Sequence, residues 1–175
     1  NSDGISDATL AACNPIPADG RAQVTATTVD GSGHTVSGSL IVVFSETTTI
    51  TVVGPTSGFT LPDGGSLRFD YTVADQKGNQ LTAGTSITVT VTGSNDVRLN
   101  GDINVVLPDM QDKDKYTRFS FTLTDTKPLD NEGNKQLSMT ISVNSPNNGN
   151  KSYILTGTLL GPNISGGGGT GSAAA

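Results

Sequence analysis

Polar and apolar residues alternate along much of this sequence, and this period of two is the feature that most restricts its fold. From Leu67 to Val73 every second residue is apolar, and the residues between them are Arg68, Asp70 and Thr72. Such alternation places successive side chains on opposite faces of a β-sheet. The same pattern recurs at 87–91, 97–99, 103–107, 119–123, 137–143 and 153–159. Apolar residues show no convincing helical spacing, so we expect an all-β protein.

Turn-forming residues separate these runs and set the spacing of the expected strands. The chain of 175 residues contains 22 Gly and 8 Pro, and Asn, Asp and Gly cluster between the apolar runs, as short strands joined by turns require. About seven strands fit between Thr47 and Gly161, a span close to the ~100 residues of an immunoglobulin-like sandwich. We therefore predict one complete immunoglobulin-like β-sandwich over residues 47–161, followed by a Gly-rich tail or linker over 162–175.

Residues 1–46 form a separate and shorter unit. Two strands are expected here, Gln23 to Thr28 and Leu40 to Phe44, around the turn from Asp30 to His34. A lone hairpin is marginally stable in water. We expect a β-hairpin segment or a partial second sandwich, and three interpretations stay open. It is the closing hairpin of a preceding sandwich, it packs onto the main domain, or it joins another chain.

The hairpin region is similar to a later part of the chain. Asp19 through Val36 aligns with Asp63 through Leu81, and the glycines of the two turns, Gly33 and Gly78, are 45 positions apart. Duplication of a unit and the common composition of two strands around a turn explain this likeness equally well.

The segment from Gly65 to Gly84 combines an alternating strand with a short polar motif. The motif is Asp75-Gln76-Lys77-Gly78-Asn79, and Leu81 and Gly84 follow it. This segment resembles bacterial Ig-like domains of the invasin and intimin type, in which a strand precedes Asp-x-x-Gly-Asn, an aliphatic residue and Gly. The resemblance covers roughly residues 47–161. It implies a rod segment of a cell-surface or secreted protein, and no catalytic residue.

Charge and residue inventory exclude several classes of function. The net charge is −6, which repels phosphate backbones and anionic lipid surfaces, so we expect no nucleic-acid partner. No apolar run approaches the length of a membrane span. His34 is the single His and Cys13 the single Cys. The sequence therefore has few of the residues that nucleophilic catalysis and thiolate metal binding require. We expect no enzyme and no cofactor, and whether Cys13 pairs with a second copy stays open.

Two acidic loops offer the oxygen ligands that calcium prefers. The candidates are Asp109, Asp112 and Asp114 in one loop and Asp130 and Glu132 in the other. Neither loop has the spacing of an EF-hand, and Asp, Asn and Gly are also ordinary residues of β-turns. Calcium is thus one interpretation, and solvated turns are the other.

Other surface features are compatible with binding. Asn150 and Asn163 begin glycosylation sequons. The aromatic residues expected on the surface, where a glycan could stack, are Phe59, Tyr116 and Tyr153, whereas Phe69, Tyr71, Phe119 and Phe121 are expected in the core.

Two segments are candidates for pairing between chains. Residues Ile87 to Thr92 form a Thr- and Val-rich strand that could add a neighbour at a sheet edge. The nearly uncharged run from Ser45 to Val53 is better interpreted as the first strand of the main domain than as a bridging strand.

These features indicate a non-enzymatic, extracellular structural or adhesive β-sandwich subunit of a cell-surface appendage or filament, which assembles by strand sharing. Its expected partners are copies of itself or adjacent Ig-like domains. The alternatives are a passive stalk module of a large adhesin and a carbohydrate-binding accessory module of a secreted enzyme, with a surface glycan as ligand.

Overall fold

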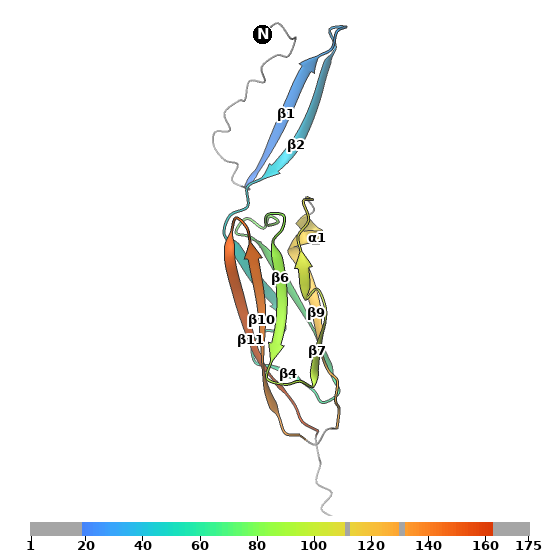
Figure 1. The fold of residues 1–175 in the computed structure, drawn as a ribbon, viewed down its shortest axis with the longest axis vertical. Helices are drawn as coiled ribbons and strands as arrows, with labels where there is room; N and C mark the ends of the chain where they lie inside the picture. The colour runs from blue at the N-terminus through green and yellow to red at the C-terminus, as the bar shows by residue number, and fades with distance from the viewer. Residues whose placement is uncertain (1–18, 111–112, 130–131, 163–175) are drawn as a thin grey trace, which may run out of the picture.

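The computed structural model describes residues 19–110, 113–129 and 132–162. These residues form β-strands and one short helix (Figure 1). The elements are β1 (Arg21–Val29), β2 (Thr35–Val43), β3 (Thr48–Gly54), β4 (Phe59–Leu61), β5 (Ser66–Asp75), β6 (Ser86–Thr92), β7 (Val97–Gly101), β8 (Asn104–Val106), α1 (Lys113–Thr117), β9 (Arg118–Asp125), β10 (Lys135–Ser145) and β11 (Gly149–Leu159). No helix in this part of the chain is long and apolar enough to cross a membrane.

Two sheets form a sandwich from β3 to β11. One has the strand order β4-β11-β10-β6-β8 and the other β3-β5-β9-β7. All pairs are antiparallel except β4 with β11. The chain enters in β3 at the edge of one sheet and crosses to β4 at the edge of the other, which is the edge-strand switch of immunoglobulin-like sandwiches. The predicted fold class, an immunoglobulin-like β-sandwich preceded by a hairpin, is confirmed.

The core lies between the two sheets and is built from the alternating positions. Phe69 and Phe121 stack with ring centroids 5.0 Å apart, and Phe59 meets Phe69 edge-on at 5.1 Å. Tyr71 is also buried, and its hydroxyl donates a hydrogen bond to the backbone carbonyl of Asp102 at 2.7 Å. Burial and the nearby charge of Asp102 raise the pKa of Tyr71. Aromatic rings from both sheets thus fix the spacing of the sandwich.

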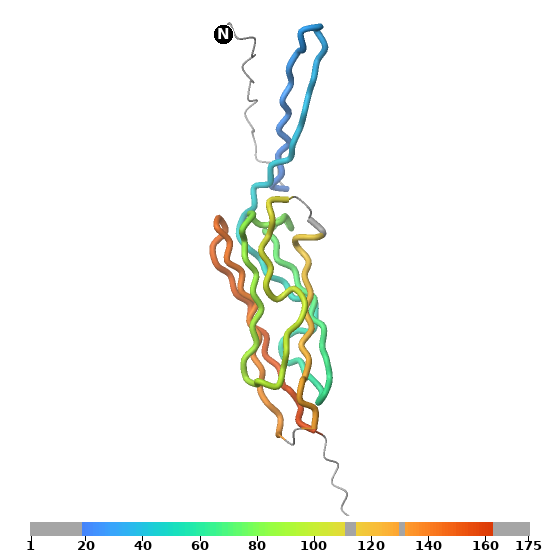
Figure 2. The backbone as a smooth tube through the Cα atoms, turned by 45° about the vertical axis from the view of Figure 1, so that its right-hand side comes forward, coloured from blue at the N-terminus to red at the C-terminus, as the bar shows by residue number. Residues whose placement is uncertain are grey.

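Strands β1 and β2 form a two-stranded sheet of their own. They pair antiparallel along their whole length, from Arg21 opposite Val43 to Val29 opposite Thr35. Figures 1 and 2 show this hairpin projecting from one end of the sandwich, beyond its loops. The hairpin therefore contacts the main domain at its base, and the rest of its length does not pack on it.

Single strands of the sandwich differ in how far their places follow from the sequence. The run before Val53 is the first strand of the sandwich, as predicted, because β3 pairs with β5. Residues Ile87 to Thr92 were expected at an edge, but β6 lies between β10 and β8. The prediction was therefore wrong for Ile87 and Thr88, which pair with β8, because alternation does not reveal strand order. The three-residue strand β4 and the five-residue helix α1 are too short to leave a periodic signal.

Candidate functional site

The hairpin β1–β2 has an apolar face that is exposed over most of its length and covered at its base, where Ala22 is 6% exposed. Because directly opposed residues share a face, the register places six apolar side chains and Gly38 together. The apolar side chains are Ala22, Val24, Ala26, Val36, Leu40 and Val42. Val24 is 40% exposed, Val36 54% and Leu40 59%. Covering these three would contribute on the order of 1 kcal/mol each, since each is already about half covered.

The hairpin has two outer edges, and Ile41 on the edge of β2 is already engaged. Asp30 N–H donates to the His34 carbonyl and Phe44 N–H to the Gly20 carbonyl, each at 2.8 Å. These two bonds show that the backbone N–H and C=O groups of even-numbered residues point toward the partner strand. Those of odd-numbered residues, such as Ser37 and Ser39, therefore point outward. No described strand lies beside either edge. An open edge is a template for strand addition.

A hydrogen-bonded junction fixes the hairpin to the sandwich. Asn79 Nδ2 donates to the carbonyl of Asp19 at 2.6 Å, and Asn79 N–H donates to Asp75 Oδ1 at 2.7 Å. On the linker side, Glu46 N–H donates to Asp75 Oδ2 at 3.3 Å and Lys77 Nζ pairs with Glu46 Oε1 at 2.7 Å. Asp75 and Asn79 are buried. Buried polar groups with several partners favour one direction of the hairpin over many.

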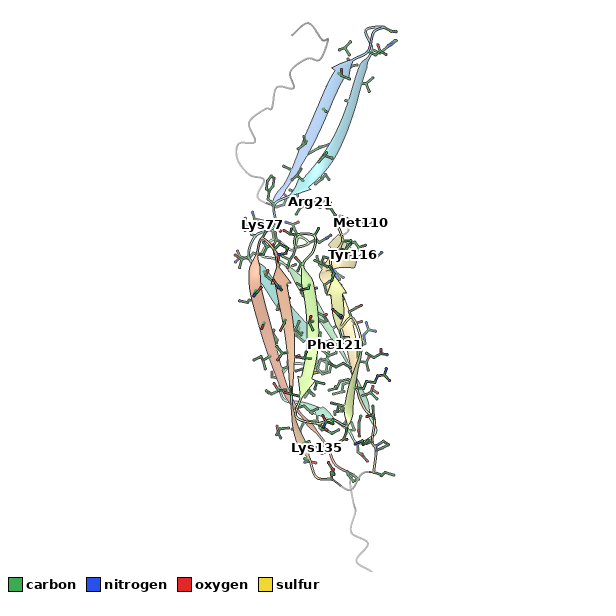
Figure 3. The ribbon with its side chains drawn as sticks, viewed as in Figure 1. Arg21, Lys77, Met110, Tyr116, Phe121 and Lys135 are labelled. Atoms are coloured by element: carbon green, nitrogen blue, oxygen red, sulfur yellow. The ribbon has the colours of Figure 1, made fainter. Side chains whose placement is uncertain are left out.

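A second loop holds the same linker from the other side. Asn148 Nδ2 donates to the carbonyls of Ser45, at 3.0 Å, and Glu46. Its Oδ1 accepts hydrogen bonds from Ser45 Oγ and, at 2.9 Å, from Ser145 Oγ. Figure 3 labels Arg21 and Lys77, which lie at this junction. The sequence placed Asn79 in the Asp-x-x-Gly-Asn motif, but it predicted no junction role for Asn79 or Asn148, because Asn in a turn indicates only a turn.

A cleft of about 410 Å³ lies beside this junction, between the base of the hairpin, residues 79–83 and residues 108–110. Ile41 and Val42 supply apolar wall, and Gln80 and Asp109 supply polar wall. Among the described lining residues Asp109 is the one carboxylate, so no pair of acids is placed there for glycoside cleavage. The cleft is a recess of mixed apolar and polar character at the base of the hairpin.

The two similar turns found in the sequence have the same hydrogen bonds. Asp30 Oδ1 accepts from the N–H groups of Ser32 and His34, and Asp75 Oδ1 accepts from those of Lys77 and Asn79. The hydrogen bonds from His34 and Ser32 lower the pKa of Asp30. Beyond the turns the likeness ends. β2 returns along β1, whereas the chain after Asn79 crosses to the other sheet and forms β6.

A cluster of charged side chains lies at the opposite end of the sandwich. Asp96 is buried and accepts hydrogen bonds from Lys127, at 2.7 Å, and from Lys135, which also pairs with Glu132. Hydrogen bonds from Lys127 and Lys135 hold the pKa of Asp96 well below its usual range. The ammonium groups neutralise the carboxylate. We therefore interpret the cluster as ion pairs that hold β10 against the neighbouring loops.

The calcium candidates are spread over different parts of the molecule. Asp109 is exposed beside the cleft, Asp114 belongs to α1, and Glu132 pairs with Lys135. Asp112 and Asp130 lie outside the described residues. Within the described part of the chain, no three His, Cys, Asp or Glu side chains lie close enough to hold a metal ion. The calcium sites stay a prediction.

Other predicted surface residues fall in mixed places. Phe59 is buried, 6% exposed, against Phe69 in the core, so its assignment to the surface was wrong. Tyr116 is partly buried against the core, and Tyr153 is 37% exposed. Asn150 is exposed on β11, and His34 pairs with Asp30 at the exposed tip of the hairpin. Cys13 and Asn163 lie outside the described residues.

Comparison with known proteins adds solved structures of similar fold. No protein-family model and no curated protein matches the sequence. The periplasmic chaperone SfaE has a TM-score of 0.47 at 6% identity, covering 67% of this chain and 59% of that chain. The E. coli chaperone DraB has a TM-score of 0.45 at 8% identity, with 70% and 60% covered. Domains 4 and 5 of the S-layer protein SbsC have a TM-score of 0.39 at 15% identity, with 81% and 70% covered.

This chain spans less than two thirds of each of the two chaperone chains. Because the scores are low, the fold assignment rests on the strand order of the two sheets, and no function is taken from these structures.

Proposed function

We propose that the protein is a non-enzymatic, extracytoplasmic β-sandwich subunit with a structural or adhesive role in a cell-surface appendage or filament. The observation that carries this proposal is the hairpin β1–β2, whose apolar face is exposed beyond its base and beside which no described strand lies. A strand pair of this kind gains stability when another polypeptide covers it, since an isolated hairpin is marginal in water.

The sandwich itself supports a structural role. Its hairpin and the end of β11 lie at opposite ends of the molecule, as Figures 1 and 2 show, so copies joined through the hairpin would extend as a rod. The hydrogen-bonded junction at Asn79 and Asn148 keeps the hairpin in one direction relative to the rod. The bacterial cell-surface interpretation, of the invasin and intimin type, belongs to this proposal.

Sedimentation velocity over a concentration series tests the proposal. We expect the full chain to form larger species as its concentration rises. Leu40→Lys, which places a charge on the open face, should keep the chain monomeric. Val53→Lys is the matched control, because Val53 is 70% exposed on the sandwich and should behave as the unmodified chain. A monomer at every concentration, or equal behaviour of both variants, would contradict assembly through the hairpin.

A passive stalk module of a large adhesin is the second candidate. It is favoured because the hairpin before β3 and the end of β11 lie at opposite ends of the sandwich. Monomeric behaviour together with resistance of the sandwich to unfolding would favour this stalk over the self-assembling subunit.

A further inference from the structure

Strand β1 has an outer edge that is long, regular and unprotected. It pairs with β2 in one continuous register over nine residues. From Gln23 to Val29 its residues are exposed, and none of them is charged or a Pro. Proteins usually protect such an edge with a charge, a Pro, a bulge or a cover, because its N–H and C=O groups otherwise pair with another chain.

The other strand edges differ from that of β1. In the sandwich, β4 and β8 have three residues each and β7 has five, and the register of β3 against β5 is irregular. On the other side of the hairpin, Ile41 of β2 is engaged. The outward backbone groups of Gln23, Thr25 and Thr27 have no hydrogen-bond partner in the described structure. Among the edges that the structure describes, β1 is therefore the one best suited to accept a strand.

The sequence of β1 is complementary to itself in the antiparallel direction. A two-fold axis at Thr25 places Thr25 opposite its own copy and Gln23 opposite Thr27 of the second copy. These side chains are uncharged and can form hydrogen bonds across the two strands. All the outward backbone groups of β1 then have a partner in the second copy.

Charge favours this direction over the parallel one. Arg21 begins β1, and Asp30 follows its last residue. In the antiparallel pair, Arg21 of each copy lies at the same end as Asp30 of the other, so opposite charges meet twice. A parallel pair would place Arg21 beside Arg21 and Asp30 beside Asp30, and like charges directly opposite each other are destabilising.

Pairing through β1 also widens the apolar face of the hairpin. Within one copy Val24 is opposite Leu40, and Ala26 is opposite Gly38. Across the axis, Val24 lies opposite Ala26 of the second copy on the same face. The four strands then share one hydrophobic face, which a sheet needs for stability of its own. Leu40→Lys, which places a charge on this face, therefore also opposes pairing through β1.

We propose that β1 is a self-recognition edge, through which two copies of the chain join antiparallel about a two-fold axis at Thr25. The product is one four-stranded sheet with the strand order β2-β1-β1-β2. Because each hairpin projects from one end of its sandwich, the two sandwiches lie at opposite ends of the shared sheet. This inference rests on the proposed function, since it names the surface and the partner through which the hairpin assembles.

Proline at an outward position tests the edge of β1. Thr25→Pro removes an N–H that points outward, so no hydrogen bond between β1 and β2 is lost. Ser39→Pro is the matched control, because Ser39 is opposite Thr25 and its N–H also points outward, on β2. In sedimentation velocity of the full chain, we expect Thr25→Pro to raise the concentration needed for association by at least about tenfold. Ser39→Pro should associate as the unmodified chain does.

Disulfide cross-linking, followed on non-reducing gels, tests the direction and the register. All variants carry Cys13→Ser, which removes the native thiol. Thr25→Cys should form a covalent dimer, since the Cα atoms of such a pair are about 5.5 Å apart, within the range of a disulfide. Ser39→Cys should stay monomeric, because its two copies are three strand spacings, about 15 Å, apart. Thr27→Cys should link to Gln23→Cys in a mixture and not to itself.

Equal association of the two proline variants, or equal cross-linking at positions 25 and 39, would overturn the inference. Preferential linking of Thr27→Cys to itself would overturn the register. Association that Leu40→Lys prevents and Thr25→Pro leaves unchanged would overturn the β1 edge while the proposed function stands. A monomer at every concentration would overturn both.

Discussion

The hairpins β1–β2 and β10–β11 have the same construction, but their apolar faces have different surroundings. Each is an antiparallel pair of long strands with apolar residues on one face. In β10–β11 that face is buried, with Met139, Ile141 and Leu155 inaccessible to solvent. In β1–β2 the corresponding face includes Leu40 at 59% exposure. The difference shows that amphipathic strands specify a sheet, while a second layer decides whether that sheet is part of a stable core.

Truncating a leucine in each of the two hairpins should give the largest difference in the free energy of unfolding. Leu159 is 5% exposed and Leu40 59%. We expect Leu159→Ala to lower the free energy of unfolding of the sandwich by about 2–5 kcal/mol, because it loses apolar burial and leaves a cavity. Leu40→Ala should change it by less than about 0.5 kcal/mol. Urea unfolding followed by far-UV circular dichroism measures both. Similar costs would mean that the hairpin belongs to the core of the monomer.

Adding a side chain at the two strand glycines should have opposite consequences. Gly157→Val forces a side chain into the ring of Phe59 and should cost about 1–3 kcal/mol of sandwich stability. Gly38→Val meets open space and should leave the unfolding transition in place. Thermal unfolding of dilute samples compares them. A destabilised Gly38→Val monomer would show that some part of the same chain already covers this glycine.

The turns at Asp30 and Asp75 allow the two regions to be compared through the hydrogen bonds of one aspartate in each. Asp75 accepts from Lys77 N–H, Asn79 N–H and Glu46 N–H and is buried at the junction, whereas Asp30 lies at the exposed tip. Asp75→Ala should therefore destabilise the sandwich by about 1–2 kcal/mol. Asp30→Ala should leave the sandwich transition unchanged, since it affects the hairpin alone. Urea unfolding of both variants decides, and equal effects would argue against separate stability of the two regions.

Acid should weaken the sandwich through Asp96. A carboxyl group with a lowered pKa in the folded state stabilises the protein above its unfolded pKa, near 4, and that stability is lost as the pH falls through the folded pKa. Hydrogen bonds from Lys127 and Lys135 lower the pKa of Asp96, so the urea midpoint should fall below about pH 4. Asp96→Asn should flatten this fall. Asp30→Asn, in the hairpin, should leave it unchanged, and the reverse pattern would contradict the assignment.

Strand positions could be predicted from the sequence because alternation is a local signal. Phe69, Phe121 and Leu123 are buried as expected, and the turn residues fall between strands. Strand order could not be predicted, since the alternation of β6 would be the same at the edge of a sheet as inside it. Phe59 was misplaced for a related reason. Its strand has three residues, and its burial depends on Gly157, far away in sequence.

The hairpin was predicted as a hairpin, but its surroundings were not. Alternation from Val24 to Leu40 is the same whether a second sheet covers the face or not, so the sequence left three interpretations open. In the structure the base of the hairpin contacts the main domain and the rest projects from it.

Amide hydrogen exchange of the dilute, monomeric chain tests the central claim most directly, because it reads the two hairpins in one sample. The account predicts fast exchange along β1–β2, slow exchange along β10–β11, and slowing of β1–β2 as the protein is concentrated or a covering strand is added. Exchange along β1–β2 as slow as along β10–β11 in the monomer would contradict it, since the hairpin would then be stable without any partner.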